Sequence, residues 1–220
     1  MRHTLIRVQG TPHFDSEFRE RFRDLLVWRR DVRQFQTTPL APGLLEELLA
    51  LACLAPSVGL SEPWRFMDVK SAECRMRICE EFARANAEAL AGYSGEQAAL
   101  YSRLKLSGLD RAPVQLAVFA DRSTVQGAGL GRQTMPETLE YSVIGAISTL
   151  WLAARAYGLG VGWVSICSPE RVNDILSSPP GWRLIAYLCI GYPEEENDTP
   201  ELEREGWEKR SPARFSLLER

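Results

Sequence analysis

The chain has 220 residues, 45% of them hydrophobic and 25% charged, which is long enough to bury one sizeable core without a second domain. Its formal net charge of -3 excludes the overall basic field that gathers polyanions, so we expect no nucleic-acid partner. No segment reaches the roughly 18 consecutive apolar residues of a membrane span, and the N-terminus lacks the apolar run of a signal peptide, so we expect a cytoplasmic protein with no membrane partner.

The first half of the chain alternates between helical and strand-like patterns. Apolar residues at helical spacing over 14–28 predict an amphipathic helix that Asp15 or Ser16 would cap. A leucine-rich run over 44–52, opened by Pro42, predicts a second helix. Beyond it, the composition predicts strands over 65–69 and 114–120 and charged helices over 72–91 and 96–106.

The second half contains the strongest helical signal, over 136–157, which is apolar on more than one face and ends at Gly158. A helix this apolar is expected to be central or to lie at a subunit interface. Continuous apolar runs over 161–166 and 184–190 predict strands covered on both faces, with a short helix over 169–176 between them.

Together these elements predict a single α+β domain over residues 1–220, with its core over about 14–210 and a small mixed β-sheet between helices. The segment 93–113 carries aromatic and aliphatic residues and could form either a lid or a surface hairpin. The tail, 193–220, lacks periodicity and is expected to wrap around the same subunit or a second copy.

Three arginines, Arg29, Arg30 and Arg33, lie within five positions at the end of the first predicted helix. Guanidinium groups clustered in this way can hold a phosphate bidentately, although a solvated basic patch is the alternative interpretation. Asp31 lies between them and could be either a functional carboxylate or a simple ion-pair partner.

Two turns could approach a ligand closely. The first contains Pro56 and Ser57 and joins a helix to a strand, which is also a common structural connection. The second contains Gly158, Gly160 and Gly162 and leads from a helix into a strand. Because a dinucleotide fingerprint needs strand, glycines and then helix, a Rossmann fold is rejected.

The sequence offers few residues for other kinds of catalytic or binding site. The two histidines, His3 and His13, lie near the N-terminus, which disfavours a histidine-based triad and a histidine-rich metal site. The glycines of QGAGLGRQTMPE do not have P-loop spacing, so a flexible loop is the simpler interpretation.

Five segments taken in order carry a family resemblance: WRRDVRQF, LAPSVGLSEPWRF, GLGRQTMPETLEYS, WLAARAYGLGVGWVSI and AYLCIGYPEEE. They resemble the 5,6-dimethylbenzimidazole synthase branch of the nitroreductase superfamily over roughly residues 14–210. The arginine cluster and the Pro-Ser turn are shared by many nitroreductases, whereas their combination with Gly-Trp-Val-Ser is typical of this branch.

The resemblance implies a homodimer that binds FMN at the subunit interface. It implies that Arg29, Arg30, Arg33 and Arg210 meet the phosphate, ribityl chain or pyrimidine edge. It further implies that the isoalloxazine is flanked by Pro56, Ser57, Gly162, Trp163 and Val164, with Ser165 nearby.

In this family Asp31 and Ser165 are the residues tied to catalysis, and proton removal near the ribityl chain suits a positioned carboxylate. The resemblance implies that reduced FMN is the substrate and molecular oxygen the co-substrate, with 5,6-dimethylbenzimidazole and erythrose 4-phosphate as products. No metal is expected, because the flavin supplies the oxygen chemistry. A flavin reductase or free reduced FMN would supply the substrate.

The Pro-Ser turn departs from the wider superfamily at two positions. Leu60 stands where many members carry Asn, and Glu62 stands where Gln is common, so a hydrogen bond from position 60 to the flavin is not expected.

Two other functions are compatible with the same residues. An ordinary FMN oxidoreductase would recycle the flavin with NAD(P)H and would need an open flavin face for a nitroaromatic or quinone. A noncatalytic flavin-binding protein would use Asp31 only structurally.

Overall fold

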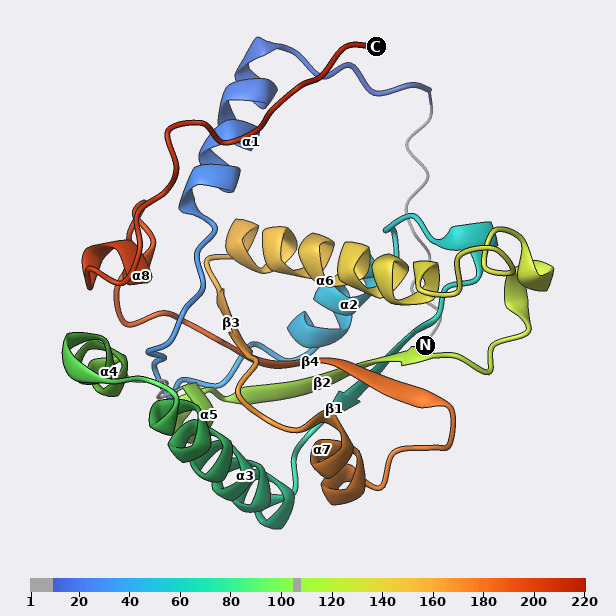
Figure 1. Ribbon diagram of the computed structural model, residues 1–220. Helices are drawn as coiled ribbons and strands as arrows, with labels where there is room; N and C mark the ends of the chain where they lie inside the picture. Colours follow the sequence, from blue (N-terminus) through green and yellow to red (C-terminus); the bar gives the residue numbers. More distant parts are fainter. Residues whose placement is uncertain (1–9, 105–107) are drawn as a thin grey trace.

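A four-stranded sheet lies between two layers of helices in the computed structural model, which describes residues 10–104 and 108–220 (Figure 1). The strands are β1 (Trp64–Asp68), β2 (Val114–Asp121), β3 (Gly160–Val164) and β4 (Trp182–Gly191). They lie in the order β1-β2-β4-β3, and each neighbouring pair is antiparallel.

The predicted mixed sheet is therefore wrong for these strands, because the sheet is antiparallel throughout. The parallel pairing that the structure does contain, among its described residues, is an isolated bridge between Asp31 and Val161. Apolar runs indicate that helices cover both faces of a strand, but they carry no information about strand direction. The predicted α+β class itself is confirmed.

Six helices follow the predicted order and begin and end within a few residues of the predicted bounds, whereas the short helices over 108–111 and 201–204 were not predicted. Asp15 caps the first helix, accepting a hydrogen bond of 2.8 Å from the Phe18 N–H. The helices are α1 (Ser16–Trp28), α2 (Leu44–Ala52), α3 (Ala72–Ala91), α4 (Gly95–Arg103), α5 (Gly108–Arg111), α6 (Thr138–Ala156), α7 (Pro169–Leu176) and α8 (Glu201–Arg204), with short 3-10 turns η1 (Val58–Leu60) and η2 (Gln126–Gly129).

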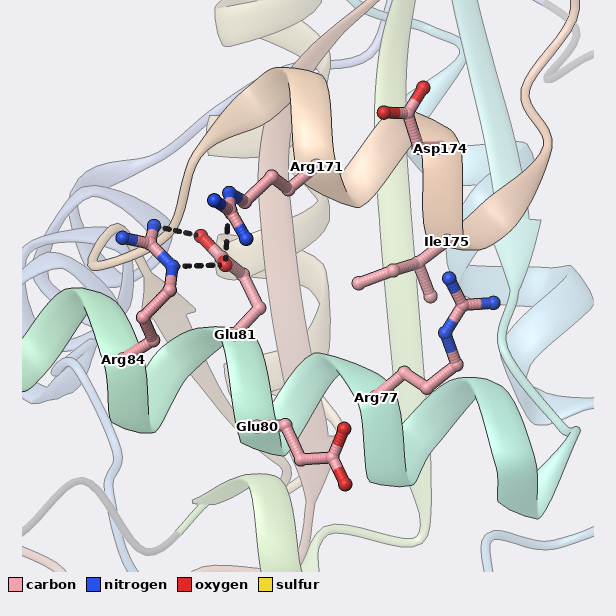
Figure 2. A pocket seen from close by; sticks show the side chains of 7 residues that line it. All are labelled: Arg77, Glu80, Glu81, Arg84, Arg171, Asp174 and Ile175. Carbon is pink, nitrogen blue, oxygen red and sulfur yellow. Dashed lines mark hydrogen bonds and ion pairs between the residues drawn. The ribbon is translucent and has the colours of Figure 1, made fainter.

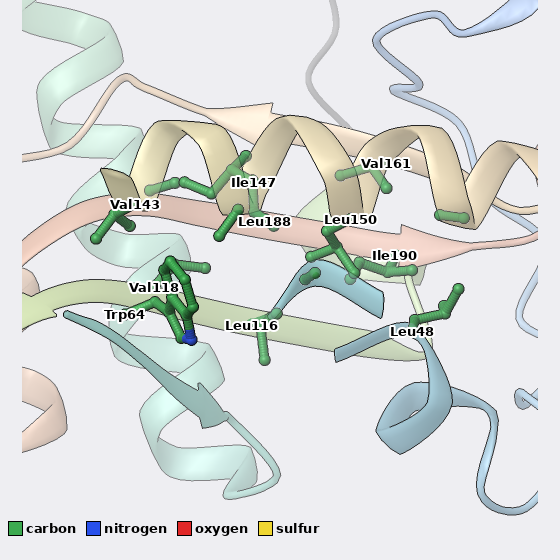
Figure 3. Close-up of a cluster of buried hydrophobic side chains, with 14 of the residues drawn as sticks. Leu48, Trp64, Leu116, Val118, Val143, Ile147, Leu150, Val161, Leu188 and Ile190 are labelled. Carbon is green, nitrogen blue, oxygen red and sulfur yellow. The ribbon is translucent and has the colours of Figure 1, made fainter. Parts of the chain in front are cut away.

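Each face of the sheet packs against its own helical layer. Alternate residues of β2 divide between the two layers, as a strand with both faces buried requires. Leu116 and Val118 face α2 and α6, where they meet Val143, Ile147 and Leu150 of α6 (Figure 3). On the other face Phe119 packs with residues of α3 and α7, including Ile78 and Val172.

Two helices keep apolar side chains in solvent in the single chain. On α6, Tyr141 and Ile144 are exposed on the face that points away from the sheet. Helix α1 stands clear of the sheet in Figure 1 and exposes a row of aromatic residues that includes Phe18 and Phe22. Contiguous exposed apolar surface of this kind marks an interaction surface.

The predicted lid and tail meet in one aromatic cluster. The Tyr93 ring lies 4.9 Å from the Tyr101 ring of α4 and 5.6 Å from the Trp207 ring of the tail. Residues 105–107 of the predicted lid lie outside the described residues, and its closing role stays a prediction. Within the described residues, no helix is both long and apolar enough to cross a bilayer.

Candidate active site

Four of the predicted arginines line one hollow of about 140 Å3, which we call the arginine hollow. The described residues that line it are Arg29, Arg30, Asp31, Arg33, Pro200, Glu201, Leu202 and Arg210. Arg210 comes from the C-terminal tail, so the fold brings together cations that are far apart in the sequence. The structure therefore groups five of the predicted site residues in one place.

Residues 29–33, which we call the arginine segment, are held between α6 and β3. The Arg29 guanidinium lies 5.1 Å from the centre of the Trp151 ring, a cation–π distance. The Trp151 indole N–H donates to the Arg30 carbonyl at 3.1 Å, and the Val32 N–H donates to the Val161 carbonyl at 3.0 Å. These contacts fix the backbone on both sides of Asp31.

Gly160 and Gly162 allow β3 to lie directly against this segment. A Cβ atom at Gly162 would lie 2.1 Å from the Val32 carbonyl oxygen, and one at Gly160 would lie 2.5 Å from a Val32 methyl group. Neither contact is possible for a larger residue without movement of the backbone. The glycines are therefore required for packing that positions Asp31.

The Asp31 carboxylate has a defined partner on each oxygen. Oδ1 accepts a hydrogen bond of 2.9 Å from the Trp163 backbone N–H, and Oδ2 lies 3.5 Å from Arg33 Nε. Burial raises the pKa of Asp31, while the Trp163 N–H, Arg33 and Arg29 act in the opposite direction. A carboxyl group with a raised pKa can exchange a proton more readily near neutral pH.

The arginine hollow has the charge and size that a phosphate dianion requires. Burial lowers the pKa of Arg29, Asp31 acts against this effect, and the positive charge of Arg210 lowers the pKa further. For Arg30, burial again lowers the pKa most, followed by repulsion from Arg210 and Arg29. Because the cations repel one another, a bound dianion would stabilise them, so these residues fit the phosphate end of a flavin mononucleotide.

The turn with Pro56 and Ser57 is anchored by hydrogen bonds that the sequence did not reveal. The Val58 N–H donates to Ser142 Oγ at 3.0 Å, and Ser142 Oγ donates to the Thr138 carbonyl at 2.6 Å. Ser57 Oγ accepts a hydrogen bond of 3.1 Å from the Glu62 N–H. Ser57 is therefore fixed relative to α6.

The two positions that depart from the superfamily pattern, Leu60 and Glu62, have positive φ angles of 55° and 42°. The Gln126 side-chain amide holds them by donating to the Leu60 carbonyl at 2.8 Å and to Glu62 Oε2 at 3.1 Å. The Glu62 carboxylate is thus directed toward η2. The Leu60 side chain is exposed.

Within one chain, the turn and the arginine hollow remain apart. The turn contacts α6 at Ser142, whereas the arginine segment contacts it at Trp151, about 13 Å further along the helix axis. Trp163 is joined to the hollow through Asp31, and Gly162 and Val164 belong to the same strand. Ser165 is exposed just after β3 and does not line the hollow.

A larger hollow of about 340 Å3 lies between α3 and α7, remote from these residues (Figure 2). Three of its six charged side chains, Glu81, Arg84 and Arg171, form one ion-pair cluster. The buried Glu81 accepts two hydrogen bonds of 2.8 Å from Arg84 and one of 2.9 Å from the Ser168 N–H, and these contacts lower its pKa to about 2. Arg171 adds a further ion pair to Glu81 at 3.7 Å. We interpret this cluster as the attachment of α7 to α3.

Comparisons with known proteins agree with the geometry. The family model described as the nitroreductase family matches residues 26–192. A 5,6-dimethylbenzimidazole synthase of Rhodospirillum rubrum is 54% identical over 201 residues, covering 91% of this chain and 95% of that protein. Another, from Rhodobacter capsulatus, is 46% identical and covers 92% of this chain and 98% of that protein.

A solved structure shows the same fold at lower identity. The crystal structure of an oxidized iodotyrosine deiodinase bound to FMN and 3-iodo-L-tyrosine has a TM-score of 0.69 and 24% identity. The match covers 90% of this chain and 97% of that one. The nitroreductase-like arrangement of helices around an antiparallel sheet is therefore shared.

Proposed function

This chain belongs to the nitroreductase family and, within it, to the 5,6-dimethylbenzimidazole synthases. From that premise we propose that it converts reduced FMN and molecular oxygen to 5,6-dimethylbenzimidazole and erythrose 4-phosphate. In this proposal FMN is the substrate, and the product is the lower ligand of cobalamin. No metal takes part. We place the reaction in the cytoplasm, supplied by a flavin reductase or by free reduced FMN.

The observation that carries the proposal is the position of Asp31 inside the arginine hollow. Arg29, Arg30, Arg33 and Arg210 would bind the phosphate end of FMN, which places the adjoining ribityl chain within reach of the carboxylate. Binding the substrate by an end that does not react fixes the reacting end in position.

Asp31 would serve as the proton-handling group. Reduced flavin supplies the electrons and the reactivity toward oxygen. The carboxylate would take up a proton near the ribityl C1' carbon as carbon bonds break, held in place by the Trp163 N–H. Ser165, at the end of β3, would hold the ring edge or a water molecule.

A second copy of the chain would complete the site. The Pro56–Ser57 turn and the arginine hollow contact opposite halves of α6, and the outer face of this helix exposes Tyr141 and Ile144. Two copies packed about a two-fold axis along this face would bring the turn of one subunit toward the hollow of the other. We therefore propose a homodimer with an interface site for FMN, in which the exposed end of the tail, beyond Arg210, packs on the partner subunit.

Replacement of Asp31 by asparagine tests this assignment. Asp31→Asn preserves the shape of the side chain and removes its capacity to accept a proton, so FMN binding should remain and product should be lost. Binding is measured by quenching of FMN fluorescence, and product by chromatography and mass. Asp174→Asn, an exposed substitution on α7, is the matched control and should retain product formation. Undiminished product from Asp31→Asn would overturn the role of Asp31.

A further inference from the structure

Glu201 reaches the arginine hollow from α8, in the C-terminal tail. Its Oε2 atom lies 3.8 Å from Arg33 Nε, and the same nitrogen lies 3.5 Å from Asp31 Oδ2. The Arg33 side chain is only 10% exposed, and that of Glu201 is 21% exposed. One buried guanidinium thus contacts two carboxylates, one of which belongs to the tail.

Sharing of this kind couples the two carboxylates. Burial raises the pKa of Glu201, Arg33 and Arg204 lower it, and the negative charge of Asp31 raises it again. Coulomb repulsion acts equally on both partners, so an ionised Glu201 must also favour the protonated form of Asp31. An ionised Glu201 therefore opposes the effect of Arg33, which favours the charged form of Asp31.

We infer that Glu201 is a positioning residue that acts through Arg33 to keep Asp31 able to take up and release a proton during the reaction. This inference rests on the function proposed above. The docking of α8 thereby influences the protonation of Asp31, and this influence is the role that we assign to the tail. Sequence spacing carries no signal for it, because Glu201 is one of several acidic residues in an aperiodic tail.

Several other groups also lie around Asp31. Trp163 donates its N–H from β3, and Cys189 of β4 is a buried thiol with a pKa raised to about 12. The charged residues that share a hollow with Asp31 are Arg29, Arg30, Arg33 and Arg210 on one side and Glu195, Arg204 and Glu205 on the adjoining side. A change confined to Glu201 therefore isolates its own contribution.

The experiment uses Glu201→Gln, which keeps the shape of the side chain and removes its charge. The Trp163 backbone amide is a reporter in the flavin-free protein, because its resonance should move when the acceptor Asp31 is protonated. We expect the titration midpoint of this amide to fall by about one pH unit in Glu201→Gln, since the negative charge that opposes ionisation of Asp31 is then removed. In the pH profile of product formation, the midpoint on the acid side should move to lower pH by the same interval.

Two controls define the outcome. Glu203→Gln makes the same charge change two positions along α8, away from the hollow, and should titrate like the wild type. Asp31→Asn should abolish the pH-dependent step and so identify its source. Glu201→Met, also uncharged, is expected to reproduce the lower midpoint and serves if the glutamine variant does not fold.

An unchanged midpoint in a folded Glu201 variant would overturn the inference. If Asp31→Asn lacks activity in the same experiments, the proposed function survives that result and only the role of Glu201 fails. If Asp31→Asn instead forms product normally, the proposed function of Asp31 fails, whatever the titration shows.

Discussion

Gly162→Ala should loosen the segment that carries Asp31. The added Cβ would lie 2.1 Å from the Val32 carbonyl oxygen and 3.3 Å from its carbonyl carbon, so β3 and the arginine segment must separate. Overpacking of this kind costs about 1–3 kcal/mol. The separation also weakens the Val32–Val161 and Asp31–Trp163 hydrogen bonds, each contributing about 1 kcal/mol.

The expected loss of about 3 kcal/mol corresponds to a fall in Tm of roughly 6–12 °C for a domain of this size. Thermal unfolding followed by circular dichroism measures it. Gly145→Ala on α6 is the matched control, because its Cβ would meet the Pro56 carbonyl at 3.9 Å, an ordinary contact, and alanine favours helix. A Gly162→Ala protein that melts with the wild type would refute the packing argument.

Two further substitutions test other contacts. Ser142→Ala removes the acceptor of the Val58 N–H, so it should cost about 1–3 kcal/mol in urea unfolding, and an unchanged midpoint would contradict the anchoring of the turn. Glu81→Gln should cost about 3 kcal/mol at pH 7, because the folded-state pKa of Glu81 is about 2 rather than 4.5. The stabilising contribution of the Glu81 charge is present above pH 4.5 and is lost as the pH falls toward 2. The free energies of unfolding of wild type and variant should therefore converge in acid. A difference in stability that does not depend on pH would show that the shape of the side chain matters rather than its charge.

Local patterns predicted the elements well, because the spacing of apolar residues depends on the local backbone period. The order of the six longer helices and of the strands could be read from the sequence, and Asp15 was one of the two caps it offered. Strand direction could not, because runs such as 161–166 and 184–190 are apolar whichever way the neighbouring strand runs.

The site was predicted in part. The arginines near α1 were recognised by their clustering, and Arg210 by family resemblance, yet only the fold shows that they share one hollow. Glu201 and Gln126 were missed because their contacts join residues far apart in the chain, which no local pattern records. The sequence showed the glycines of β3, but the reason for them, the close approach of Val32, became visible only in the fold.

The most direct test mixes purified protein with chemically reduced FMN under air, without NAD(P)H, and follows 5,6-dimethylbenzimidazole by chromatography and mass. The proposed function predicts product in proportion to protein, with consumption of the flavin. Recovery of intact FMN, together with turnover of NAD(P)H and a nitroaromatic or quinone, would contradict it and would identify an ordinary flavin oxidoreductase.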